Sequence, residues 1–92
     1  MELVTSVNKM QGKALAARND GKLIGLVPTM GCLHKGHTSL MDEGRNRSDL
    51  LVATVFVNPV QFGVGEDFEK YPKNLALDMA IASESGVDIL FA

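Results

Sequence analysis

Apolar residues recur along the chain in two patterns, at helical spacing in some segments and as short continuous runs in others. In the first twenty residues the apolar side chains fall on one helical face, which predicts a helix; they are Leu3, Val7, Met10, Ala14 and Ala17. Thr5 or Ser6 is placed to cap this helix. The turn sequence Asn19-Asp20-Gly21 is expected to end it.

Three apolar runs, at residues 23–27, 50–57 and 87–91, predict strands that are buried on both faces. Helical spacing returns between them, from residue 33 to 47 and from residue 75 to 85. Strands that alternate with helices indicate a parallel sheet with right-handed crossovers. The sequence therefore predicts an α/β fold, the first half of a Rossmann-like parallel sheet with three strands and three flanking helices.

The last predicted strand runs to the final residue, and no helix follows to cover it. A strand inside a parallel sheet normally has helices on both faces. We therefore expect the 92 residues to be part of a longer domain, or to be covered by a partner. The third strand is expected to be an exposed edge, which would favour self-association.

Composition excludes several classes of function. The formal net charge of −2 argues against a nucleic-acid or membrane-surface partner, because both favour a basic face. A single cysteine, Cys32, allows no disulfide within the chain and suits a reducing compartment. No apolar run reaches the roughly 20 residues of a membrane span, and the first ten residues do not read as a signal peptide. The cytoplasm is the expected location.

Two unusual stretches follow the first two predicted strands. PTMGCLHKGH, residues 28–37, follows the first strand, and NPVQF, residues 58–62, follows the second. In an open parallel sheet, ligands bind beyond the carboxyl ends of the strands. Because adjacent strands bring such loops to one edge, the two stretches together predict a binding site.

The first stretch carries groups suited to phosphate. Gly31 and Gly36 allow a ligand to approach the backbone, and the following helix is expected to present unpaired amide N–H groups. His34 and His37 can donate hydrogen bonds to phosphate oxygens, and Lys35 adds positive charge. Donors aimed at a departing pyrophosphate are what nucleotidyl transfer requires. The stretch is not a P-loop, because GxxxxGK[ST] is absent.

Other interpretations of these residues remain open. His37 can instead be a structural histidine that packs beside Leu40 and Met41. Cys32, His34 and His37 form a C-x-H-x-x-H cluster, but a structural zinc site usually has four ligands, and the chain has no further Cys or His. The sequence therefore predicts no metal site in this stretch, and Cys32 is not expected to act as a nucleophile.

The second stretch offers amides. Asn58 and Gln61 can hydrogen-bond the hydroxyls or carboxylate of a substrate, or they can be the solvated amides of a turn. Beyond them, Glu66-Asp67 reads as a solvated acidic loop and Tyr71 as a packing residue.

Three motifs resemble the pantothenate synthetase (pantoate–beta-alanine ligase) family. They are VPTMGCLHKGHTSL, VFVNPVQFGVGEDFEKYPK and SGVDILFA. HxGH alone indicates only the wider nucleotidyltransferase superfamily, which includes class I aminoacyl-tRNA synthetases. The pattern PTMGxLHxGH followed by FVNPxQFxxxED…YP narrows the resemblance to this one enzyme family.

The resemblance implies an activity. The family ligates (R)-pantoate and beta-alanine to pantothenate in coenzyme A biosynthesis, and splits ATP to AMP and pyrophosphate with Mg²⁺ required. Pantoyl adenylate is the intermediate. The family's partners are thus small molecules, and its members are commonly homodimers.

The resemblance also implies site residues, with His37 and His34 as the catalytic pair. The implied ATP-binding residues are Thr29, Met30, Gly31, Cys32, Leu33, His34, Lys35, Gly36 and His37. The residues implied for pantoate and beta-alanine are Pro28, Met30, Asn58 and Gln61.

Family members continue well beyond 92 residues. They add a lysine–aspartate loop, a further pantoate-binding glutamine, a serine–arginine phosphate loop and a carboxyl-terminal lid domain. Residues 1–92 thus correspond to the amino-terminal portion of the nucleotide-binding domain, and we expect little or no ligase activity from them alone. The competing hypotheses are a non-catalytic nucleotide-binding or self-associating module, and another HxGH adenylyltransferase.

Overall fold

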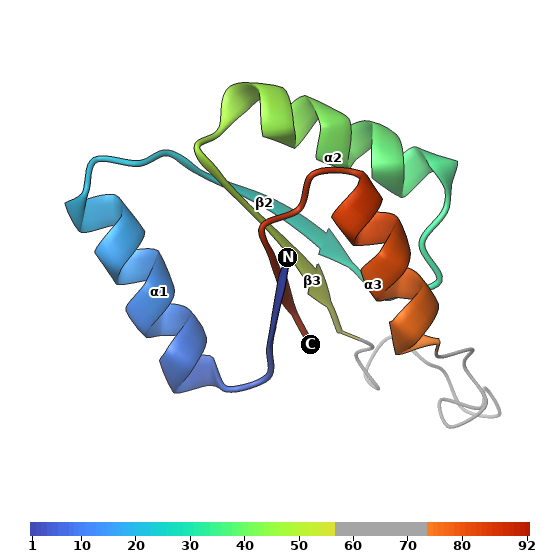
Figure 1. The fold of residues 1–92 in the computed structure, drawn as a ribbon, viewed down its shortest axis with the longest axis horizontal. Coiled ribbons are helices and arrows are strands. Elements are labelled where there is room, and N and C mark those ends of the chain that lie inside the picture. Colours follow the sequence, from blue (N-terminus) through green and yellow to red (C-terminus); the bar gives the residue numbers. More distant parts are fainter. Residues whose placement is uncertain (57–73) are drawn as a thin grey trace, which may run out of the picture.

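The computed structural model describes residues 1–56 and 74–92 (Figure 1). Within these ranges the elements are, in chain order, β1 (Glu2–Val4), α1 (Val7–Asn19), β2 (Ile24–Thr29), α2 (Lys35–Arg47), β3 (Leu50–Val55), α3 (Leu75–Glu84) and β4 (Ile89–Phe91). None of the helices in the described ranges has the length and apolar character needed to cross a bilayer.

The strands form one parallel sheet in the order β1-β4-β3-β2. β2 and β3 pair along their whole length, from Ile24 opposite Leu50 to Thr29 opposite Val55. β4 pairs with β3 on one side and with β1 on the other. The predicted parallel α/β architecture is confirmed.

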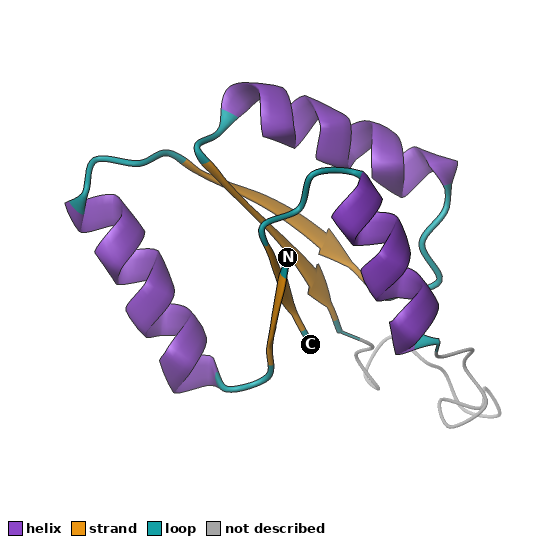
Figure 2. Cartoon of the chain, in the orientation of Figure 1, coloured by secondary structure: helices purple, strands orange, loops and turns teal. Residues whose placement is uncertain are grey.

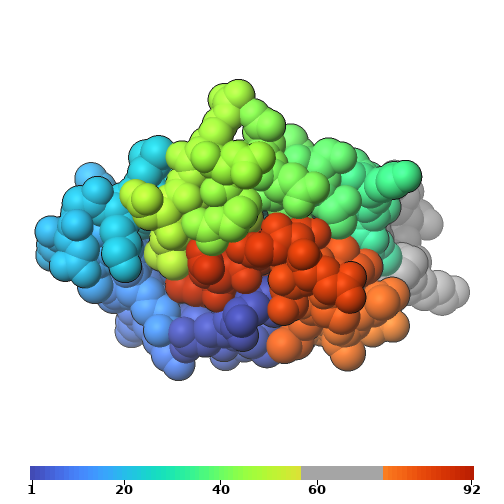
Figure 3. Space-filling model, turned by 45° about the horizontal axis from the view of Figure 1, so that its top comes forward, coloured from blue at the N-terminus to red at the C-terminus, as the bar shows by residue number. Residues whose placement is uncertain are grey.

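Helices cover both faces of the sheet, with α2 and α3 on one side and α1 on the other (Figure 2). The chain moves from β1 to β2 across the sheet in one direction, and returns through β3 to β4 in the other. Right-handed crossovers in opposite directions place their helices on opposite faces. The space-filling view shows α3 and the segment after it lying against α2, with the amino-terminal segment beside them (Figure 3).

The larger apolar cluster lies under α2 and α3, and the smaller one lies on the α1 side. The larger contains Val27, Leu33, Met41, Leu51, Ala53, Ala82, Val87 and Leu90. The smaller contains Val4, Val52 and Ile89, with Met10 of α1 packed against it. The smaller face is also less covered: Leu26, whose register partner is Val52, is 62% exposed.

The amino terminus differs from the sequence prediction. Residues 2–4 form β1 rather than the start of a helix, and Leu3 pairs with Leu90 of β4. α1 begins at Val7 after Ser6, one of the two predicted caps, whose hydroxyl accepts a hydrogen bond from the Lys9 N–H at 3.3 Å. Leu3 happens to fit the helical spacing, but a three-residue strand is stabilised by its pairing partner, which lies at the other end of the chain.

The prediction that the third apolar run is an exposed edge strand is wrong. That run contains β4, which lies between β3 and β1. Among the described strands the edges are β1 and β2. The error follows from the missed strand, because only β1 supplies the second partner of β4.

α2 packs closely on the sheet through a small residue. A Cβ at Gly44 would lie 2.7 Å from Cδ1 of Leu51, so a larger residue would force either that side chain or α2 to move. Met41 on the same face is fully buried. Leu40 was expected on this face too, but it is 58% exposed.

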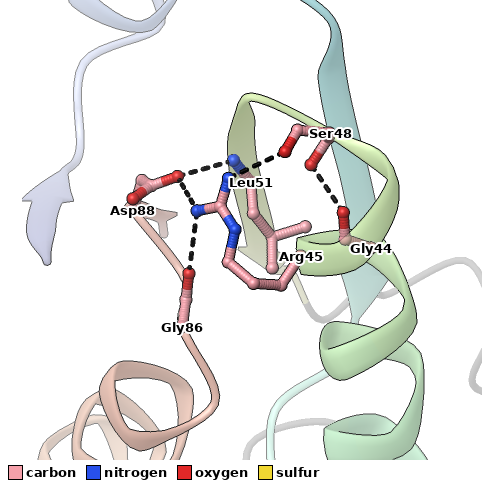
Figure 4. A network of polar contacts seen from close by, with 6 residues as sticks. All are labelled: Gly44, Arg45, Ser48, Leu51, Gly86 and Asp88. Carbon is pink, nitrogen blue, oxygen red and sulfur yellow. Dashed lines mark hydrogen bonds and ion pairs between the residues drawn. The ribbon is translucent and has the colours of Figure 1, made fainter.

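A polar network at the amino end of the sheet ties α2 and β3 to the segment that precedes β4 (Figure 4). The guanidinium of Arg45, in the last turn of α2, bonds to the Asp88 carboxylate at 2.5 Å and donates to the carbonyl oxygens of Gly86 and Ser48. Asp88 also accepts a hydrogen bond from the Leu51 N–H at 2.8 Å. The network lies at the end of β3 opposite to the predicted binding site.

Candidate functional site

The carboxyl ends of β2 and β3 lie side by side at one edge of the sheet. Thr29 and Val55, the last residues of the two strands, are register partners. The N–H of Phe56 donates to the carbonyl oxygen of Thr29 at 2.9 Å. The two strands that precede the predicted binding segments therefore end at the same edge of the sheet, as expected.

The second predicted segment lies outside the described residues. It includes Asn58, Gln61, Glu66, Asp67 and Tyr71. The predicted site residues that the structure describes all come from the first segment. Of these, Thr29, Gly31 and Leu33 are buried, Met30 and His37 are half-buried, and Pro28, Cys32, His34, Lys35 and Gly36 are exposed.

The turn after β2 has an unusual backbone. Gly31 and Cys32 are consecutive residues with positive φ angles, of +89° and +52°. A side chain at Gly31 would also lack space, because its Cβ would lie 3.2 Å from Val55 and 3.3 Å from the Asp78 carboxylate. At Cys32 the left-handed conformation costs on the order of 1 kcal/mol. Contacts elsewhere must therefore hold the turn.

Thr29 supplies one of these contacts. Its buried hydroxyl donates to the Thr54 carbonyl oxygen at 2.8 Å and accepts from the Gly31 N–H at 3.1 Å. The side chain thus ties the start of the turn to the neighbouring strand.

Asp78 supplies the other contact. One carboxylate oxygen accepts from the Leu33 N–H at 2.9 Å, and the second accepts from the Cys32 N–H at 3.2 Å. The side chain is 3% exposed and lies in the first turn of α3, where the helix dipole favours a negative charge. The sequence analysis did not single it out. The available signal was one carboxylate within the otherwise apolar run LALDMAIA.

His34 and His37 cap the first turn of α2 through their ring nitrogens. His34 is the N-cap residue, and its Nδ1 accepts from the Gly36 N–H at 3.1 Å. Nδ1 of His37 accepts from the His34 N–H at 3.1 Å, and the two ring centroids are 4.0 Å apart. A neutral imidazole whose Nδ1 accepts a hydrogen bond carries its proton on Nε2. Both rings therefore present Nε2–H as a donor.

The backbone of this segment differs from the prediction. The N–H groups of Cys32, Leu33, His34 and Gly36 all donate to side chains of the protein itself. They are not the unpaired donors that the sequence predicted. The two imidazole Nε2–H groups and the exposed ammonium of Lys35 are donors that an anion can reach.

The His34 side chain requires a small residue at position 36. A Cβ at this position would lie 2.9 Å from Cε1 and 3.2 Å from Nδ1 of His34. The glycine lets the imidazole lie across the first turn of α2.

The surroundings of His37 disfavour the protonated form of its ring. Burial lowers the pKa of His37 from its ordinary value of 6.5, and the neighbouring His34 lowers it further, while Asp78 acts in the opposite direction. A neutral ring at pH 7 is a hydrogen-bond donor without a positive charge.

The structure also bears on the two other interpretations of the histidines. In the described ranges no group of three or more His, Cys, Asp or Glu residues is arranged to hold a metal ion. Nδ1 of each ring is already bonded to an amide. His37 does have a structural role as a cap, but its half-buried ring leaves Nε2 for a further contact.

A family profile and individual known proteins match this chain, and both point to the same family. The sequence profile of the family described as Pantoate-beta-alanine ligase matches residues 2–92. The pantothenate synthetases of Geotalea daltonii and Geotalea uraniireducens are 61% and 59% identical over 92 residues, which is all of this chain and 33% of each relative. The chain therefore spans about a third of the length of these relatives.

Similar solved structures belong to the same family. The pantothenate synthetase of Thermus thermophilus has a TM-score of 0.84 and 46% identity, and the match covers 100% of this chain and 32% of that one. A pantoate-beta-alanine ligase from Francisella tularensis, solved in complex with beta-gamma ATP and beta-alanine, has a TM-score of 0.84 and 35% identity, over 99% of this chain and 34% of that one.

Proposed function

Because this chain belongs to the pantoate–beta-alanine ligase family, we propose that it forms the amino-terminal part of the site at which ATP, (R)-pantoate and beta-alanine react to give pantothenate, AMP and pyrophosphate. The observation that carries this proposal is the pair of imidazoles at the start of α2, each with Nδ1 bonded to a backbone amide. The pair lies beyond the edge where β2 and β3 end.

The first step transfers an adenylyl group. A carboxylate oxygen of pantoate attacks the α-phosphorus, the new P–O bond forms, and the bond to the β-phosphate oxygen breaks. The electron pair leaves with pyrophosphate, which gains negative charge. Nε2–H donors of His34 and His37 and the ammonium of Lys35 are the groups that stabilise this charge.

The second step forms the amide. The amine of beta-alanine attacks the acyl carbon of pantoyl adenylate, the bond to AMP breaks, and the amine loses a proton. The Francisella tularensis neighbour, whose crystals contained an ATP compound and beta-alanine, supports both substrates for a protein of this fold.

Substrate contacts are proposed for the rim of the same edge. Pro28 is exposed at the end of β2, and Met30 follows it half-buried, so both can contact a bound acid. We assign Asn58 and Gln61 to hydrogen bonds with pantoate, with Gln61 also near beta-alanine, as the family resemblance implies. ATP is assigned to the segment from Thr29 to His37.

Mg²⁺ is proposed to enter with the nucleotide. The carboxylate nearest to the turn, Asp78, has both oxygens bonded to backbone N–H groups and does not fit a cation ligand. The described residues also offer no cluster of three ligating side chains. Mg²⁺ commonly keeps its waters and binds through substrate phosphates.

Two further properties are proposed with the function. A homodimer is expected, as is common in the family, and sedimentation of a full-length protein tests it. A cytoplasmic location is expected because the substrates are small metabolites and the one cysteine is an exposed thiol.

The test uses a full-length chimaera in which residues 1–92 replace the matching third of the Geotalea daltonii relative. We expect ATP- and pantoate-dependent release of pyrophosphate, and His37→Ala to reduce it by about a hundredfold or more. Ser39→Ala is the matched control, because the Ser39 hydroxyl bonds only within α2, to the Lys35 carbonyl oxygen.

The outcomes separate the hypotheses. Unchanged turnover in His37→Ala would exclude this imidazole from the chemistry. Pyrophosphate release with another carboxylic acid in place of pantoate would identify a different adenylyltransferase. The chain of 92 residues by itself is expected to release no pyrophosphate, because it spans about a third of its relatives.

A further inference from the structure

We propose that Asp78 is a positioning residue that holds the turn of Gly31 and Cys32, and through it His34, in the arrangement that receives the nucleotide phosphates. This inference rests on the proposed function and adds a residue from a different element to it. Asp78 is too deeply buried to meet a ligand, so it acts through the backbone of the turn.

The Asp78 carboxylate supplies one acceptor oxygen for each of two amides in the turn. The two oxygens of Asp78 accept hydrogen bonds from two successive amides, those of Cys32 and Leu33. A carboxylate has two acceptor oxygens and no donor, so it satisfies both N–H groups at once. The preceding amide, of Gly31, is bonded to Thr29. Three successive amides of the turn are thus held by acceptors from two different elements.

The turn needs such restraint because it is strained. Cys32 is a non-glycine residue with a positive φ, a conformation that persists only where the surroundings stabilise it. Without the Asp78 carboxylate, two N–H groups next to a packed interior lose their acceptor, and the turn is expected to relax toward ordinary φ angles. Loss of the carboxylate is therefore expected to destabilise the turn more than the rest of the fold.

The position of the turn also fixes the positions of His34 and His37. Leu33 has a buried side chain and precedes His34, the N-cap of α2. The His34 N–H is in turn bonded to Nδ1 of His37. A shift of the turn therefore moves the His34 backbone and breaks the reciprocal capping of the two rings. Displacements of about 1 Å at such a site can reduce rates by about a hundredfold.

The first measurement is made on the chain itself and does not depend on catalysis. Asp78→Asn replaces one acceptor oxygen with a donor NH₂ group, which faces an amide N–H. We expect hydrogen exchange at the Cys32 and Leu33 amides to accelerate by roughly tenfold or more relative to amides of β3. Asp88→Asn is the matched control, because Asp88 also accepts from a backbone N–H, that of Leu51, but at the far end of the sheet.

The second measurement is made on the full-length chimaera. Asp78→Asn is expected to raise the KM for ATP and lower kcat, by roughly tenfold to a hundredfold in kcat/KM. Asp88→Asn is expected to leave kcat/KM within about twofold, although it too lowers the unfolding temperature. Asp78→Glu keeps both oxygens and is expected to recover part of the loss, and it replaces Asp78→Asn in both measurements if that variant does not fold.

Two results would overturn the inference. One is unchanged exchange at Cys32 and Leu33 in Asp78→Asn. The other is a loss of kcat/KM in Asp88→Asn as large as that in the Asp78 variants at equal loss of stability, because that points to a general structural role. If the chimaera with Asp78 intact releases no pyrophosphate, the proposed function fails, and amide exchange still decides whether Asp78 holds the turn.

Discussion

The imidazole of His34 lies across the backbone of Gly36, so closely that a methyl group at Gly36 would stand 2.9 Å from its Cε1 atom. Gly36→Ala is therefore expected to displace the ring and to break its bond with the Gly36 N–H. We expect the chimaera carrying Gly36→Ala to lose roughly tenfold or more in pyrophosphate release, because the Nε2–H donor moves from its place. Steady-state kinetics measure this loss.

Gly12→Ala is the matched control for this change. Gly12 lies in α1, and a Cβ there has no neighbour within 4 Å. Alanine is the better helix former by about 1 kcal/mol, so this variant is expected to unfold at a slightly higher temperature with unchanged turnover. Equal activity of the two variants would show that the His34 ring does not need Gly36.

Acid is expected to destabilise the protein through His37. Its folded pKa lies below 6.5, the ordinary value, first because of burial and then because of His34. Between the lowered value and 6.5 the unfolded chain binds a proton that the folded chain does not. Stability therefore falls as the pH drops through this window, and the loss stops growing below the folded pKa.

His37→Gln removes the titrating group and isolates its contribution. Urea unfolding of both proteins at about pH 7.5 and about pH 5.5 is the measurement. We expect the original protein to lose more stability between the two pH values than the variant does. An identical loss in both would contradict a lowered pKa of His37.

The two arginines in the last turn of α2 are expected to contribute very differently to stability. Arg45→Ala removes the ion pair with Asp88 and the bonds to Gly86 and Ser48, and we expect a loss of roughly 1–3 kcal/mol. Arg47→Ala removes an exposed pair with Glu43, for which we expect less than about 0.5 kcal/mol. Chemical denaturation of both variants makes the comparison, and similar losses would show that the network of Figure 4 is unimportant.

Neighbouring apolar residues of α2 give a test of the core. Met41 is fully buried under the helix, so Met41→Ala is expected to cost about 2–5 kcal/mol. Leu40 is 58% exposed, and Leu40→Ala is expected to change stability by less than about 1 kcal/mol. A larger effect at Leu40 than at Met41 would mean that α2 is rotated from the orientation described.

The local pattern of apolar residues was sufficient to predict all three helices, apart from the start of α1, and three of the strands. The bounds predicted from apolar spacing agree closely with α2, α3, β2, β3 and β4. The local pattern did not predict β1, because these three residues form a strand through their pairing with β4. The position of β4 inside the sheet follows from that same pairing and was missed with it.

For the candidate site, too, the sequence predicted some features and missed others. The sequence singled out His34, His37 and the two glycines, because their residue types and spacing next to a strand are unusual. It did not indicate that the amides of Cys32, Leu33, His34 and Gly36 are occupied, or that Asp78 occupies two of them. Those bonds join residues 45 and 46 positions apart, and nothing in local spacing records them.

By itself the sequence determined which segments are helical or extended, that the sheet is parallel, and which residue types stand at the ends of its first two main strands. These features follow from interactions between residues near each other in the chain. The tertiary structure alone decided that an aspartate from α3 holds the turn before His34, and that each imidazole has its Nδ1 bonded to an amide and its Nε2–H left as the donor. The reason is that a hydrogen bond depends on where two groups lie in space, and only the packing of α3 against the sheet brings that carboxylate to the turn.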